Sequence, residues 1–223
     1  MIKKYFLGIL LILATSISYG QIVINEIDSD TPGTDLKEFV ELKTITPNFS
    51  LDGYVMVFFN GNAASASTGN KSYFTISLNG LVTDINGLVV VGNIGVGPLP
   101  ARIFSNSTIQ TGPDAVAVYQ GTYEDFPEGT LATTTNLVTA LGHGNHTGDD
   151  MAELLVLLGN PPYGKEGTTS AIAQVNSIQR KPDGTYESKL PTPGANNDGS
   201  GVIFNGITIS VPENVYNEGQ SFP

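Results

Sequence analysis

Three aspartates stand close together near the start of the chain, in the stretch "NEIDSDTPGTDLKEFVEL" at residues 25–42. Asp28, Asp30 and Asp35 surround a Pro–Gly pair, and carboxylate oxygens are the ligands that calcium prefers. Asp28, Asp30 and Gly33 match positions 1, 3 and 6 of an EF-hand loop, but position 12 lacks the bidentate carboxylate. Two interpretations therefore stay open: a calcium site of flexible geometry, and a turn in which the aspartates accept hydrogen bonds from their own backbone.

Both histidines of the chain lie in a second polar stretch, "GHGNHTGDD", at residues 142–150. His143, His146 and Asp149 are residue types that bind zinc, since imidazole and carboxylate groups suit this ion. A glycine-rich turn before a helix explains the same residues without a metal. The zinc site is therefore an alternative to a plain turn.

Other catalytic signatures are missing from the sequence. The chain has no cysteine, so a thiol nucleophile is excluded. Neither the G-x-S-x-G elbow of hydrolases nor a G-x-x-x-x-G-K-[ST] phosphate loop occurs. An enzyme would therefore have to use the acidic loop or the histidine cluster as a metal-dependent hydrolase.

Short β-type segments separated by Gly, Asn, Pro and Asp would have to position these residues. Two of them, residues 54–60 and 87–92, are apolar on both faces, which is typical of a strand at the centre of a sandwich. The spacing predicts an all-β, immunoglobulin-like antiparallel sandwich. The predicted strands are residues 22–27, 38–43, 54–60, 73–78, 87–92, 115–120, 137–141 and 176–181.

One segment has helical periodicity instead. Apolar residues recur at i, i+3, i+4 and i+7 from Met151 to Leu158, with Asp150 as a candidate N-cap and Gly159 as a stop. We expect one short inserted helix that packs against its own domain, because so short an amphipathic stripe is rarely stable alone.

Residues 1–20 have the features of an export signal: a basic start, an apolar run and small residues before the expected cleavage point. The run is too short to span a membrane, and no second apolar stretch of that length follows. The remaining chain has eight basic and 21 acidic residues, a formal charge of −13. Such a surface repels phosphate backbones, so we expect no direct nucleic-acid binding.

The two ends of residues 21–197 carry a family resemblance. "IVINEIDSD" followed by "DLKEFVEL" at the start, and "NSIQRKPDGTY" leading into "PTPGANN" at the close, resemble the lamin tail domain of exported bacterial proteins. The resemblance implies an immunoglobulin-like fold with no assigned catalytic residues. Residues 198–223 then form a linker and the start of a possible further Ig-like or Calx-β-like module.

Two classes of function remain. The favoured hypothesis is a noncatalytic, secreted or cell-surface module that binds or positions a protein or glycan partner, with calcium as its candidate cofactor. The alternative is a metal-dependent hydrolase, or an accessory domain of a longer secreted nuclease or phosphatase. The absence of tryptophan gives the glycan version no support from the sequence.

Overall fold

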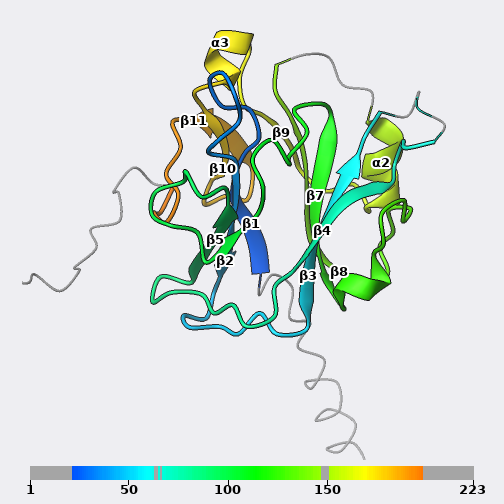
Figure 1. Ribbon diagram of the computed structural model, residues 1–223, viewed down its shortest axis with the longest axis horizontal. Coiled ribbons are helices and arrows are strands. Elements are labelled where there is room, and N and C mark those ends of the chain that lie inside the picture. Colours follow the sequence, from blue (N-terminus) through cyan, green and yellow to red (C-terminus); the bar gives the residue numbers. More distant parts are fainter. Residues whose placement is uncertain (1–21, 63–64, 66, 147–150, 198–223) are drawn as a thin grey trace, which may run out of the picture.

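The computed structural model describes residues 22–62, 65, 67–146 and 151–197, and it confirms the predicted all-β, immunoglobulin-like sandwich. Two sheets lie face to face, and short helices lie on the outer side and at one end of this sandwich (Figure 1). Residues 1–20, which carry the predicted export signal, lie outside the described part of the chain. So does the predicted further module at 198–223.

The first sheet has the strand order β11-β10-β1-β2-β5-β6. β1 lies near its centre and pairs antiparallel with both β2 and β10. The first strand therefore lies beside one of the last strands of the described chain. Its strands are β1 (Ile22–Asp28), β2 (Phe39–Thr44), β5 (Leu88–Gly92), β6 (Arg102–Ile103), β10 (Ser177–Arg180) and β11 (Tyr186–Lys189).

The second sheet has the strand order β4-β3-β7-β8-β9. β3 and β7 pair along their whole lengths at its centre. Its strands are β3 (Tyr54–Asn60), β4 (Ser72–Ser77), β7 (Asp114–Gln120), β8 (Leu137–Gly144) and β9 (Tyr163–Lys165).

The apolar side chains form three clusters that follow the alternation of the strands. Phe58, Val116 and Leu141 of the second sheet pack against side chains such as Ile24 of the first sheet in the central core. Alternate residues of β3 and β7 face the opposite way and form a second cluster that includes Leu154. Residues 54–60 are therefore apolar throughout because both faces of β3 are covered.

The second cluster is covered by the predicted inserted helix, α2 (Ala152–Leu157), which lies on the outer face of the second sheet (Figure 1). The predicted cap at residue 150 lies outside the described residues. Two further short elements were not predicted: the one-turn α3 (Ser170–Ala173) and the 3-10 helix η1 (Tyr123–Asp125). None of the helices in the described ranges has the length and hydropathy needed to cross a membrane.

All eight predicted strands are present, but the sheets are not purely antiparallel. β6 pairs parallel with β5, and β9 pairs parallel with β8. Parallel neighbours require a crossover connection, and the segment containing α2 supplies it between β8 and β9. The short strands β6, β9 and β11 had no alternating pattern long enough to predict them.

Candidate functional site: an apolar groove and a buried acid pair

Two buried glutamates hold the end of the domain onto its first strands. Glu26 and Glu41 are register partners on β1 and β2, and both are fully buried. Oε1 of Glu26 accepts hydrogen bonds from Ser177 Oγ (2.6 Å) and Thr192 N (2.8 Å), and Oε2 accepts from Thr192 Oγ1 (2.8 Å). Burial raises the pKa of Glu26, and these hydrogen bonds offset only part of the increase.

Glu41 holds the "PTPGANN" turn in the same way. It accepts hydrogen bonds from Asn25 Nδ2 and from the backbone N–H of Gly194, each at 2.6 Å. Burial raises the pKa of Glu41 to about 8. The donors to the two glutamates are amides and hydroxyls. Arg180 instead hydrogen-bonds the Tyr186 hydroxyl.

A third buried glutamate, Glu38, holds a loop between β6 and β7. Its two carboxylate oxygens accept hydrogen bonds from the backbone N–H groups of Thr108 (2.9 Å) and Ile109 (3.0 Å). Burial raises the pKa of Glu38 to about 7. These three glutamates are used to hold the backbone, so they are not free for catalysis.

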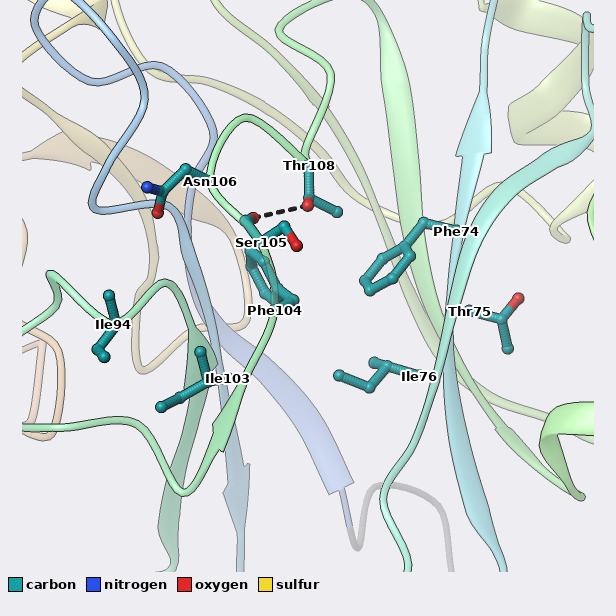
Figure 2. Close-up of a pocket in the computed structure, with 9 residues that line it drawn as sticks. All are labelled: Phe74, Thr75, Ile76, Ile94, Ile103, Phe104, Ser105, Asn106 and Thr108. Carbon is teal, nitrogen blue, oxygen red and sulfur yellow. Dashed lines mark hydrogen bonds between the residues drawn. The ribbon is translucent and has the colours of Figure 1, made fainter.

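The loop held by Glu38 forms one wall of an open groove of about 710 Å³. The groove lies between two edge strands, β4 of the second sheet and β6 of the first. Figure 2 shows Phe74 and Ile76 pointing from β4 toward Phe104, while Thr75 points away. Ile94 and Ile103 are 68% and 47% exposed.

Two sets of hydrogen bonds close the ends of this groove. At one end Arg102 reaches across from β6 and donates to the carbonyls of Ser77 (2.8 Å) and Asn79 (2.7 Å). At the other end the hydroxyl of Tyr73 accepts a hydrogen bond from Gln110 N (3.1 Å). The two sheets are thus joined on both sides of the apolar lining.

The opening aspartates do not act as one group. Asp35 Oδ1 accepts hydrogen bonds from the backbone N–H (2.8 Å) and hydroxyl (3.3 Å) of Thr31, which is the turn arrangement that one interpretation of the sequence predicted. Asp28 is instead buried, with 5% of its surface exposed. Burial and repulsion from neighbouring carboxylates raise the pKa of Asp28 to about 8, and the same two effects raise the pKa of Asp30.

The structure adds a residue that the sequence did not single out, Glu166. It follows β9 and is fully buried, and its Oε1 accepts a hydrogen bond from the backbone N–H of Ser29 at 2.5 Å. Burial raises the pKa of Glu166 well above its usual value, and the next largest cause is repulsion from Asp28. Because Ser29 follows Asp28 directly, the hydrogen bond from Ser29 N places the Glu166 carboxyl group at the end of β1.

The two histidines occupy different environments. His143 points into the sandwich opposite Asp114 in the β7–β8 register and is fully buried. Burial lowers the pKa of His143 to about 3, so its ring is neutral. His146 is partly buried and lies near Asp30, whose pKa it lowers. Asp149 lies outside the described residues, so the predicted zinc site stays a prediction.

Within residues 22–62, 65, 67–146 and 151–197, no group of three or more His, Asp or Glu side chains is arranged so that it could hold a metal ion. Two features remain as candidate sites. One is the apolar groove between β4 and β6, and the other is the acid pair formed by Asp28 and Glu166.

Comparisons with known proteins give no further assignment. No protein-family model matches the chain, and no curated protein and no solved structure matches it significantly.

Proposed function

We propose that this chain is a noncatalytic, exported module of the lamin-tail type that binds a protein partner at the cell surface. The observation that carries the proposal is the groove between β4 and β6, with its five apolar lining residues. The predicted export signal and the lamin-tail resemblance of residues 21–197 support the same conclusion.

The groove suits an extended protein segment with apolar residues at alternate positions. Leu78 N–H bonds to the carbonyl of Tyr54 on β3, so by alternation the backbone groups of Thr75 and Ser77 face the other edge of β4. The carbonyl of Ser77 is occupied by Arg102, which leaves the backbone groups of Thr75 and the N–H of Ser77 for an added segment. A segment entering the groove can add to that edge through main-chain hydrogen bonds while its side chains contact Phe74, Ile76 and Phe104.

The chemistry of the lining also selects the class of partner. None of the nine residues that line the groove is charged, and most of them are apolar. An apolar lining favours a protein segment over a glycan, which requires hydrogen-bonding groups. The formal charge of −13 after removal of residues 1–20 opposes nucleic-acid binding.

The hydrolase alternative gains no support from the geometry of the described residues. His143 is enclosed in the core and both of its ring nitrogens lack a hydrogen-bond partner, so no substrate reaches it without local opening. The buried glutamates of β1 and β2 are occupied by backbone and hydroxyl donors.

The test uses a displayed library of random twelve-residue peptides selected against the chain from residue 21 to 223. We expect enriched peptides with alternating apolar residues, and we expect Ile94→Ser/Ile103→Ser to weaken their binding at least tenfold by fluorescence anisotropy. Both isoleucines are exposed, so the stability of the fold changes little. Ile85→Ser, at a 72% exposed residue outside the groove, is the matched control.

Equal binding by the groove variant and the wild type would refute the proposal, as would selected peptides whose amide-shift perturbations avoid β4. Failure to enrich any peptide, together with binding of soluble cell-wall glycans, would replace the protein partner by a glycan.

A further inference from the structure

The acid pair joins the two sheets at the margin opposite the groove. Asp28 ends β1 of the first sheet, and Glu166 follows β9 of the second. The sheets approach each other closely here: a Cβ on Gly164 would lie 2.5 Å from Ile178 Cγ2. The hydroxyl of Tyr186 also donates to the carbonyl of Ile24 nearby, at 2.6 Å.

Two carboxylate oxygens at this margin are buried without a hydrogen-bond partner. They are Asp28 Oδ1 and Glu166 Oε2, and the two residues are 5% and 0% exposed. The buried Ser29 hydroxyl lies beside them and interacts with Glu166. Buried polar atoms are nearly always satisfied, so two such oxygens on neighbouring side chains point to a ligand that accepts electron pairs.

Carboxylates gather around these oxygens. Glu26, Asp30 and Asp35 all raise the pKa of Asp28 by repulsion, and Asp28 and Asp30 do the same to Glu166. Two bases lie in the surroundings: His146 is near Asp30, and Lys37 lines the same pocket as Asp28. Bringing so many carboxylates together without a cation is costly.

A proton shared between the carboxyl groups is the competing explanation, and it joins only one oxygen of each acid. A cation can bind one oxygen of each acid and the Ser29 hydroxyl at once, and an all-oxygen set suits a hard ion. The two explanations differ in their response to added calcium.

We propose that Asp28, Ser29 and Glu166 form a binding site for a hard divalent cation of the calcium type. This site differs from the loop predicted by the sequence, since Glu166 from the opposite sheet takes the place of Asp30 and Asp35. Water and backbone carbonyls complete the six to eight oxygens that calcium requires. Asp28 also lines a pocket of about 400 Å³, which gives the ion a path to solvent.

A cation at this position has a structural role. It binds two residues at the end of β1 and one that follows β9, and so links the two sheets. Because it binds only the folded state, it stabilises the fold by mass action. The site is independent of the apolar groove, so either proposal can fail without the other.

The experiment measures thermal unfolding and calorimetric calcium binding of residues 21–223 at pH 7.5, first in excess chelator and then in millimolar calcium. We expect one calcium ion per chain and a melting temperature that rises with calcium concentration. Glu166→Gln and Asp28→Asn should each weaken calcium binding at least tenfold. Asp35→Asn is the control, because an amide oxygen can still accept from Thr31 and binding should be unchanged.

Two results would overturn the proposal. If calcium produces neither heat nor a thermal shift, and Glu166→Gln is more stable than the wild type in chelator and calcium alike, the pair is a protonated acid pair. If Asp35→Asn abolishes binding while Glu166→Gln retains it, the ion belongs to the opening loop. The use of two variants keeps the test valid if one of them fails to fold.

Discussion

The substitution Glu38→Gln tests whether desolvation or hydrogen bonding controls the buried glutamates. Glu38 receives two backbone N–H groups, from Thr108 and Ile109, and it is fully buried. Hydrogen bonds favour the ionised form and burial disfavours it, and burial is the larger effect, raising the pKa from 4.5 to about 7. Glutamine has the same shape without the charge.

The loss of unfolding free energy caused by this substitution should become smaller as pH rises. Between pH 4.5 and pH 7 the native state keeps a proton that the unfolded state releases, so the wild-type free energy of unfolding falls as pH rises. The increase from 4.5 to about 7 corresponds to about 3.4 kcal/mol, and structural relaxation with water penetration reduces the effect to about 1–2 kcal/mol. The glutamine variant lacks this decrease.

At pH 5 the variant should be less stable by about 1–2 kcal/mol, because the glutamine NH₂ faces one of the two backbone donors and cannot accept its hydrogen bond. At pH 8 this deficit should shrink nearly to zero, since the wild type then carries a desolvated carboxylate. The assay is urea unfolding of both proteins at the two pH values, with the exposed Glu128→Gln as control. A deficit that grows from pH 5 to pH 8 would refute the reasoning, because it would mean that the hydrogen bonds outweigh burial.

Three further predictions concern packing and the closing segment. Leu154→Ala should lower the free energy of unfolding by about 2–5 kcal/mol in a denaturant titration, because Leu154 is the fully buried residue of α2. Val156→Ala, at a 64% exposed residue of the same helix, should lower it by less than about 0.5 kcal/mol. Gly92→Ala should lower the melting temperature by several degrees, since the new Cβ would lie 2.7 Å from both the carbonyl oxygen of Glu38 and the Cβ of Phe39. An unchanged melting temperature would mean that β2 and β5 are not so closely paired. Thr192→Val should cost about 1–2 kcal/mol by losing the hydroxyl bond to a buried carboxylate, and amide exchange near residue 192 should accelerate; exchange as slow as in the wild type would contradict the assigned role of that bond.

The sequence predicted the elements whose pattern is local. Residues 54–60 could be identified as a central strand because both faces of β3 are apolar, and α2 because its leucines recur with helical spacing. Strands of two to four residues, such as β6 and β9, carry too few positions to show alternation.

The candidate sites could be predicted only in part, because they depend on contacts between distant residues. Asp28 was selected from its neighbours in the sequence, but its partner Glu166 lies 138 positions further along and becomes adjacent only when β9 pairs with β8. In the same way the groove combines Phe74 and Phe104, which belong to different sheets. A local pattern carries no information about such pairs.

The attachment of the closing segment to β1 determines how the domain bears tension. Asn197 donates to the carbonyl of Asn25 at 2.7 Å, so the chain enters and leaves the sandwich at almost the same point. A pulling force applied to the two flanking segments is therefore borne first by this contact and by the bonds from Thr192 and Gly194 to the buried glutamates. These bonds break one after another, so the last residues would peel away at low force while the sheets stay intact. Under such tension this segment would act as an extensible link that lengthens before the groove between β4 and β6 is lost.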